Sequence, residues 1–220
     1  MEFAHLESAD RTRLALERGE HDPARFRASL LGVPPLDRDV WVDRVLGLDD
    51  AQFDDGPELP RGCVPYMPSR VDVVLRAIDR ASVSSTDVFV DVGSGVGRVV
   101  TLVYLLSGAT VVGLEIQSAL VRAARELASR FRLTRVAHAH GDAADLLGSV
   151  EATSVLFLYC PFSGERLNRL LDDHVEPIAR LRPLRLCCVD VPLPTRDWLS
   201  AASALDDEMI LYRTTAHAGR

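Results

Sequence analysis

Apolar and polar positions follow one pattern up to about residue 65 and another from residue 66 to the end. In the second part, short β-branched, apolar runs alternate with stretches of helical periodicity. The runs that predict strands cover residues 88–92, 110–114, 136–139, 154–159 and 184–189, and the predicted helices cover 70–81, 98–106, 118–130 and 165–179. Strands that are apolar throughout and alternate with helices predict a parallel sheet buried on both faces.

The end of the chain departs from this alternation. Residues 198–202 and 209–213 form two short runs, and the segment between them is too short for a crossover helix. Such a pair predicts an antiparallel hairpin. We therefore expect an α/β fold of the Rossmann-like, doubly wound type, with a mostly parallel seven-stranded sheet that ends in this hairpin.

The first 65 residues contain the start and stop signals of short helices. Asp22-Pro23 predicts an N-cap followed by a first-turn proline, and Gly32 ends that helix. Two more helices are predicted, one from Ser8 or Asp10 to about Gly19, and one that Asp37 caps, that Gly47 ends and whose apolar stripe is Val40, Trp41, Val45 and Leu46. The acidic stretch 49–60 predicts a surface loop. We thus expect a helical cap or lid over residues 1–65 and an α/β domain over 66–220.

The most informative segment is Asp91-Val92-Gly93-Ser94-Gly95-Val96-Gly97, which lies between the first predicted strand and a predicted helix. Glycines at such a position allow a tight turn and a close approach of a ligand to the backbone. A turn that binds nothing is the structural alternative. The position of the turn between a strand and a helix favours a ligand-binding loop.

Two classes of cofactor use such a loop. A dinucleotide-binding loop needs glycine or alanine where this chain has Arg98, and the carboxylate of Asp91 would oppose a pyrophosphate. S-adenosylmethionine carries an ammonium and a sulfonium and no phosphate, so Asp91 would contact it favourably. The loop therefore predicts an S-adenosylmethionine site that includes Asp91, Gly93, Ser94, Gly95 and Gly97.

Two acidic residues follow later predicted strands. Glu115, with Ile116 next to it, ends the second strand and can accept both ribose hydroxyls, although a surface glutamate at a helix start is the alternative. Asp142, with Ala143, follows the third strand and can accept a hydrogen bond from the adenine amino group. Asp142 is also a good N-cap, and the two roles are compatible.

The fourth predicted strand ends in Tyr159-Cys160-Pro161-Phe162. Ligands of open α/β sheets bind beyond the carboxyl ends of the strands, so Tyr159 is a predicted cofactor contact and Cys160, Pro161 and Phe162 are predicted to face the substrate. A strand-to-loop corner packed by an aromatic side chain is the alternative. Tyr159 and Tyr66 are the candidate catalytic residues, and no general base is assigned.

Composition and charge limit the kinds of partner that the protein is expected to bind. The net charge is −7, and an acidic chain lacks the clustered positive charge that nucleic-acid binding needs, so no nucleic-acid partner is expected. All 25 basic residues are arginine, which indicates codon bias rather than function. The four cysteines lack metal-ligand spacing, and neither a signal peptide nor a membrane-spanning run is evident. We expect no metal, no membrane contact and a cytoplasmic location.

These motifs, in this order, resemble those of the class I S-adenosylmethionine-dependent methyltransferases, over about residues 66–214. Residues 88–97, and the helix entered at residues 66–69, also look like the non-SET histone lysine methyltransferases. The resemblance implies that Asp91, Gly93 and Gly95 line the methionine end of the cofactor, Glu115 the ribose and Asp142 the adenine.

Family members that methylate amines often carry an Asn/Asp-Pro-Pro-aromatic motif after the fourth strand. This chain keeps one proline and the aromatic residue, Pro161 and Phe162, and lacks the Asn or Asp. The sequence thus predicts a methyltransferase whose acceptor is a small molecule or a protein side chain. The alternatives are an NAD-dependent oxidoreductase and a catalytically silent S-adenosylmethionine-binding interaction module.

Overall fold

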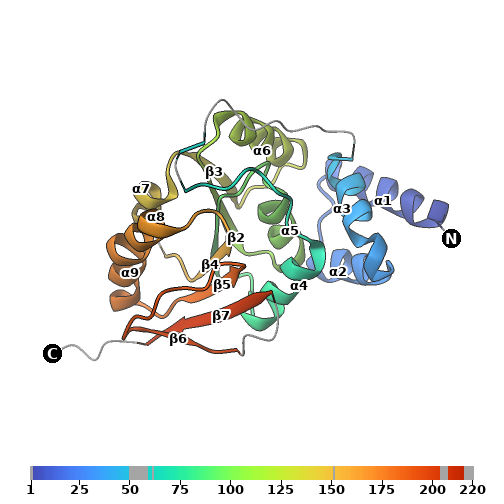
Figure 1. The fold of residues 1–220 in the computed structure, drawn as a ribbon. Helices are drawn as coiled ribbons and strands as arrows, with labels where there is room; N and C mark the ends of the chain where they lie inside the picture. The colour runs from blue at the N-terminus through green and yellow to red at the C-terminus, as the bar shows by residue number, and fades with distance from the viewer. Residues whose placement is uncertain (1, 50–58, 61, 151, 204–207, 216–220) are drawn as a thin grey trace.

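The computed structural model describes residues 2–49, 59–60, 62–150, 152–203 and 208–215. Within these residues seven strands form one sheet in the order β3-β2-β1-β4-β5-β7-β6 (Figure 1). The strands are β1 (Val88–Val92), β2 (Thr110–Glu115), β3 (Val136–His140), β4 (Val155–Tyr159), β5 (Arg185–Val189), β6 (Leu199–Ala201) and β7 (Met209–Thr214). The predicted fold class is confirmed.

Strands β1 to β5 are parallel, and β7 lies antiparallel between β5 and β6. Because β1 lies between β2 and β4, the chain moves outward to β3 on one side and then returns to β4 on the other. This reversal places a crevice at the carboxyl ends of β1 and β4, where doubly wound sheets bind their ligands.

Helices cover both faces of the sheet (Figure 1). They are α4 (Val71–Arg80), α5 (Arg98–Ser107), α6 (Ser118–Arg130), α7 (Ala143–Leu146), α8 (Gly164–Arg169) and α9 (Glu176–Leu181). Successive strand residues point to opposite faces, so Phe157 joins the core beneath α4, α5 and α6, whereas Leu156 and Leu158 join the core beneath α7, α8 and α9. This explains why the strands are apolar along their whole length.

The single helix predicted over residues 165–179 is interrupted by a π-helical segment, Leu170–Val175. Pro177 follows this segment in the first turn of α9. A proline has no N–H for the α-helical ladder, and its ring would clash with the carbonyl group four residues earlier. A wider local turn removes that conflict, which the hydrophobic periodicity alone does not report.

The N-terminal part forms α1 (Glu2–Glu17), α2 (Pro23–Leu31) and α3 (Arg38–Leu46). The Asp22 side chain caps α2, as predicted, by accepting a hydrogen bond of 3.0 Å from the Arg25 backbone N–H. Two predictions were wrong. The first helix begins at Glu2 rather than at Ser8 or Asp10, and Val40 is 58% exposed, with Val42 buried in its place. The buried face of α3 therefore consists of Trp41, Val42, Val45 and Leu46.

Helices α1 to α3 do not form a core of their own. Their buried side chains, Trp41 and Phe26 among them, belong to the same apolar cluster as those of α4 and α5. The rings of Trp41 and Phe26 pack 5.8 Å apart, centroid to centroid. The division into units 1–65 and 66–220 stays a prediction. The predicted loop over residues 49–60 lies mostly outside the described residues.

One buried arginine joins the N-terminal helices to the α/β domain. Arg98, the first residue of α5, is 4% exposed. Its guanidinium donates to Asp43 of α3 at 2.6 Å, to Asp39 of α3 at 2.9 Å, and to the backbone carbonyl of Ser69. Asp39 also accepts a 2.9 Å hydrogen bond from the Val71 N–H at the start of α4. The guanidinium of Arg98 thus links α5 to α3 and to the segment before α4, and Asp39 extends the link to the start of α4.

We expect Arg98→Met to lower the free energy of unfolding by about 3 kcal/mol, because it leaves two aspartates without their partner at a desolvated contact. The measurement is urea denaturation. Arg18→Ala is the control, since its pair with Glu20 is more than half exposed and screened by solvent, so the variant should unfold at nearly the same urea concentration as the wild type. We call the buried contacts of Arg98 with Asp39, Asp43 and Ser69 the clasp. Equal losses of unfolding free energy in both variants would show that the clasp stabilises the fold no more than an exposed ion pair does.

Candidate functional site

The glycine loop after β1 turns in a backbone conformation that side chains disfavour. Gly93, Gly95 and Gly97 all have positive φ angles, of 80°, 53° and 78°. A Cβ atom on Gly93 would come within 3.0 Å of the Pro161 Cβ, and one on Gly95 would collide with the ring of Tyr66. Glycine is therefore required here both for the turn and for the close approach of two neighbouring segments.

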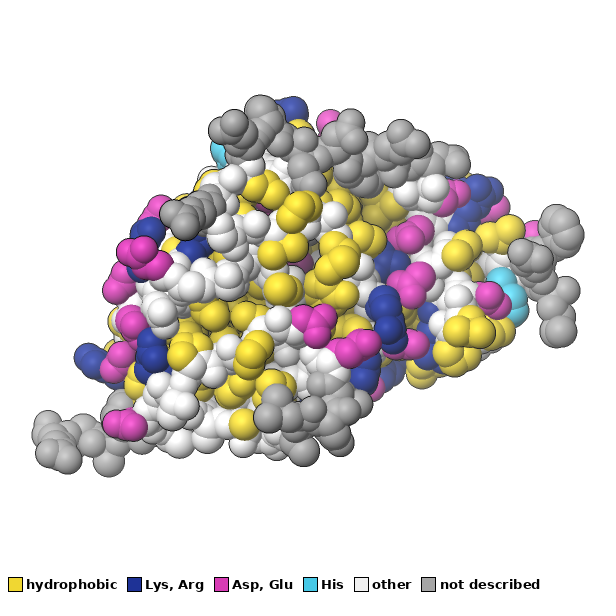
Figure 2. Space-filling view, viewed as in Figure 1, with side chains coloured by type: hydrophobic (Ala, Val, Ile, Leu, Met, Phe, Trp, Pro, Cys, Tyr) yellow, Lys and Arg dark blue, Asp and Glu magenta, His cyan; other side chains and the backbone are white. Residues whose placement is uncertain are grey.

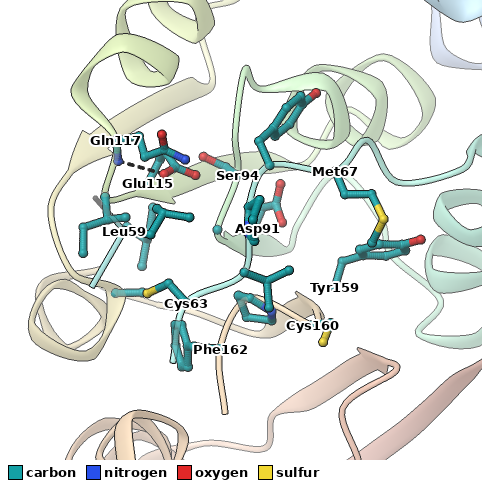
Figure 3. A pocket seen from close by; sticks show the side chains of 18 of the residues that line it. Leu59, Cys63, Met67, Asp91, Ser94, Glu115, Gln117, Tyr159, Cys160 and Phe162 are labelled. Carbon is teal, nitrogen blue, oxygen red and sulfur yellow. Dashed lines mark hydrogen bonds between the residues drawn. The ribbon is translucent and has the colours of Figure 1, made fainter. Parts of the chain in front are cut away.

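A pocket opens beside this loop at the carboxyl ends of β1, β2 and β4 (Figure 3). It is lined by most of the residues that the sequence singled out: Tyr66, Asp91, Gly93, Ser94, Glu115, Ile116, Asp142, Ala143, Tyr159, Cys160, Pro161 and Phe162. Residues that lie far apart in sequence thus line one pocket, as the doubly wound topology predicts for residues at strand ends.

Two predicted contacts do not line the pocket, namely Gly95 and Gly97. Gly95 donates its backbone N–H to Glu115 and packs against Tyr66, while Gly97 faces the ring of His138. Both glycines shape the loop rather than its ligand surface. Several lining residues were not predicted: Leu59, Cys63, Val64, Met67, Gln117 and Arg166. No short motif marks them, and only their place in the fold brings them to the site.

Glu115 is buried at 6% exposure, and its carboxylate lies on the pocket wall (Figure 3). One oxygen accepts from the Gly95 N–H and the other from the Gln117 N–H, both at 2.8 Å. These bonds hold the side chain in one orientation. Each carboxylate oxygen has a second lone pair, so Glu115 can still accept hydroxyl groups from a ligand.

Asp91 is buried at 3% exposure near the end of β1, in the pocket wall (Figure 3). Burial raises the pKa of Asp91 to about 8, and the nearby charge of Glu115 adds to the rise. Arg98 also lines the pocket, but its guanidinium is bound to α3 and to Ser69. The site thus holds a desolvated carboxyl group that a cationic ligand would stabilise in its charged form.

Asp142 caps the short helix α7, as predicted, by accepting a 2.9 Å hydrogen bond from the Ala144 N–H. Its other oxygen pairs with Arg166 of α8, and both side chains are less than a fifth exposed. The Arg166 Nε is buried and has no partner among the described residues. Asp142 is therefore fixed in place at the pocket edge by a residue that sequence analysis did not single out.

The segment after β4 is held by residues 62–70, which precede α4 and which we call the strap. The Val64 N–H donates to the Pro161 carbonyl and the Ser163 N–H to the Gly62 carbonyl, each at 3.2 Å. Cys160 has a φ of 43°, which is costly for a residue with a side chain. The strap and the strained corner both line the pocket and pack against the glycine loop.

The two candidate catalytic tyrosines are weak acids that keep their protons. Burial raises the pKa of Tyr66 to about 12, and burial together with Asp190 and Glu208 raises the pKa of Tyr159. Both phenols are therefore protonated at neutral pH. They can orient an acceptor through hydrogen bonds but do not supply a ready general base.

Hydrophobic side chains gather around the hollow above the strand ends, whereas charged side chains lie toward its rim and over the N-terminal helices (Figure 2). Val64 and Met67, on the strap, are 40% and 52% exposed and line the pocket. The mouth of the site thus combines apolar walls with few polar groups, which is typical of small-ligand pockets.

Comparison with known proteins agrees with this geometry. The family model for histone methylation protein DOT1 matches residues 66–142, about a third of the chain. No curated protein matches the chain. A solved RNA methyltransferase from Salinibacter ruber, in complex with S-adenosyl-L-homocysteine, is 28% identical with a TM-score of 0.51, over 70% of this chain and 97% of that one.

Two more distant structures share the fold. The putative methyltransferase yhhF from Escherichia coli is 16% identical with a TM-score of 0.52, over 70% of this chain and 92% of that chain. A putative caffeoyl-CoA O-methyltransferase from Staphylococcus aureus is 10% identical with a TM-score of 0.53, over 69% of this chain and 86% of that chain. The fold, the glycine loop and these likenesses define a class I, Rossmann-like S-adenosylmethionine-dependent methyltransferase, as predicted. Within that class, the segment around the glycine loop is similar to the DOT1 family.

The raised pKa of Asp91 has a measurable consequence for stability. Its folded pKa, about 8, lies above the ordinary value of 3.8, so the unliganded protein loses stability as the pH rises from about 4 to about 8. Asp91→Asn removes this loss. We expect urea denaturation to give similar free energies of unfolding for both proteins at pH 4.5, and a variant more stable by several kcal/mol at pH 9. A constant difference at both pH values would contradict the raised pKa.

Proposed function

We propose that the pocket binds S-adenosylmethionine with its methionine end at Asp91, its ribose at Glu115 and its adenine near Asp142. The observation that carries this proposal is the buried carboxyl group of Asp91, which has no ion-pair partner among the described residues and faces the pocket. A cationic ligand stabilises the charged form of such a group, whereas a pyrophosphate would be repelled by Glu115 and would keep Asp91 protonated. The remaining assignments follow from the order of the strand ends.

The bound cofactor supplies an activated methyl group, so the protein's task is to position and shield the reacting groups. Gly93 lets the backbone approach the ligand closely, and the strap at Val64 and Met67 closes the apolar side of the pocket. Glu115 is held by two backbone N–H groups and needs no reorganisation on binding. These features favour orientation and exclusion of water over acid–base chemistry.

The acceptor is proposed to enter along Tyr159, Cys160 and Phe162, where β4 ends. The two tyrosine phenols, at residues 66 and 159, remain protonated, so the acceptor atom is one that accepts a methyl group without prior removal of a proton by these side chains. A small molecule and a protein side chain both fit this requirement. The Salinibacter ruber protein acts on RNA by its description, which adds RNA as a further candidate.

We also propose a cytoplasmic location. Among the described residues no helix is both long and apolar enough to cross a membrane. All four cysteines are free thiols, which is typical of a reducing compartment.

The cofactor assignment is tested by calorimetric titration of the purified protein with S-adenosylmethionine, S-adenosylhomocysteine and NAD. We expect binding of the first two in the micromolar range and none of NAD. Because the pKa of Asp91 is about 8 before binding, a bound cation should also displace a proton near pH 7. The measured enthalpy should then vary with the ionisation enthalpy of the buffer, and Asp91→Asn should abolish that variation. Binding of NAD alone would assign the protein to the oxidoreductases.

Glu115→Ala is the sharpest test of the ribose assignment. We expect the variant to bind S-adenosylhomocysteine about 10- to 100-fold more weakly, equivalent to roughly 1–3 kcal/mol, because it removes a buried acceptor and frees two backbone N–H groups. Glu165→Ala, an exposed residue in the first turn of α8, is the matched control and should bind normally. An unchanged affinity in Glu115→Ala would remove Glu115 from the cofactor site.

A further inference from the structure

One short segment of this acidic protein is rich in exposed arginines. Helix α6 and the turn that leads to the edge strand β3 expose five arginines, and Glu126 is the one acidic residue between residues 118 and 140. We call these arginines the arginine face; they are Arg122, Arg125, Arg130, Arg132 and Arg135. The net charge of −7, which is a sum over the whole chain, does not reveal this cluster.

The arginine face differs from other arginines of the chain in how its charges are compensated. Elsewhere, arginines such as Arg44 and Arg196 form ion pairs with neighbouring aspartates. None of the five arginines of the face forms an ion pair with any residue in the described part of the chain. The feature is therefore segregation of charge rather than abundance of arginine.

Three of these arginines are held in place by backbone carbonyl groups. Arg125 donates to the His138 carbonyl at 2.8 and 3.2 Å, Arg130 to that of Leu46 at 3.1 Å, and Arg135 to that of Gly108 at 2.8 Å. A carbonyl group has no net charge, so these bonds order the guanidinium groups without neutralising them. Ordered arginines lose less conformational entropy when they bind an anion.

The same contacts argue against one kind of partner. Strand β3 is the last strand on its side of the sheet, and an open edge can pair with a strand from another protein. Arg125 covers the His138 carbonyl of β3, and no other strand pairs with this edge among the described residues. An edge blocked in this way fits a partner that is recognised by its charge better than a partner that adds a strand.

We propose that the arginine face binds the phosphate backbone of a nucleic acid. Helix α6 has 13 residues and is about 20 Å long, which spans several backbone phosphates. The net charge of −7 does not prevent this binding, because the Debye length is about 8 Å at physiological ionic strength and screens acids on the far side of the molecule. A folded chain of 220 residues has a radius of gyration of about 17 Å, so charges on opposite sides of it lie more than one Debye length apart. The inference does not depend on which group is methylated.

The test is fluorescence anisotropy with a labelled 20-nucleotide single-stranded RNA and a DNA duplex of the same length, at 50 to 200 mM salt. We expect the wild-type protein to bind with an affinity that falls steeply with salt. Arg122 and Arg132 are exposed, and their side chains form no hydrogen bond or ion pair within the described part of the chain, so the double variant Arg122→Glu/Arg132→Glu should fold normally. It should bind at least tenfold more weakly and with a shallower salt dependence.

The matched control is Arg25→Glu/Arg213→Glu, which makes the same change in net charge at two exposed arginines outside the face. This control should bind nucleic acid within threefold of the wild type. Both double variants should keep the wild-type affinity for S-adenosylhomocysteine, which shows that they are folded and separates this inference from the proposed function. If the Glu variant loses that affinity, Arg122→Gln/Arg132→Gln replaces it.

Three results would overturn the proposal. The first is absence of RNA and DNA binding by the wild-type protein at 50 mM salt. The second is equal weakening in the face variant and in the control, which would indicate a general charge effect. The third is competition by polyglutamate as strong as competition by RNA of equal charge, which would point to an acidic protein partner. Tighter binding of RNA than of the duplex, or the reverse, identifies the kind of nucleic acid.

Discussion

Arg98 lies at the first turn of α5, directly after the glycine loop, and its guanidinium contacts α3, the segment before α4 and, through Asp39, the start of α4. A buried cation must be compensated, and here the compensation comes from two aspartates of the N-terminal helices. The position of the glycine loop, of the strap and of the N-terminal helices therefore depends on one contact. In the sequence, Arg98 serves only as evidence against a dinucleotide-binding loop. In the structure, Arg98 connects the N-terminal helices to the glycine loop.

The site itself is organised around carboxylates that are treated differently by their surroundings. Glu115 is fixed by two backbone N–H groups, and Asp142 is fixed by a helix N-terminus and Arg166. Asp91 has no such partner, and its pKa rises to about 8. The two fixed acids are preorganised acceptors, whereas Asp91 is the group whose free energy changes most when a cation arrives. This difference suits a ligand that carries its positive charge at one end and hydroxyl and amino groups at the other.

Charge is distributed as unevenly over the surface as it is in the pocket. Asp10, Asp39 and Asp43 of the N-terminal helices pair with arginines, whereas the segment that carries the arginine face has Glu126 as its one acidic residue. The expectation of no nucleic-acid partner rests on net charge, which averages over surfaces that screening separates in solution, and it stays a prediction. Whether a face attracts an anion depends on the charges within about one Debye length of it, and only the folded arrangement defines that set.

The sequence by itself determined the class of the protein. Continuous apolar, β-branched runs predicted the strands, the loop from Asp91 to Gly97 marked the cofactor end of the sheet, and Glu115 and Asp142 followed from their places at strand ends. These features are local, so they are legible without the fold. Tertiary structure decided the rest: the clasp at Arg98, the pairing of Asp142 with Arg166, the role of Gly95 and Gly97 in shaping the loop, and the uncompensated charge of the arginine face. Each of these joins residues far apart in sequence, or depends on which charges are absent nearby, and no local pattern reports either.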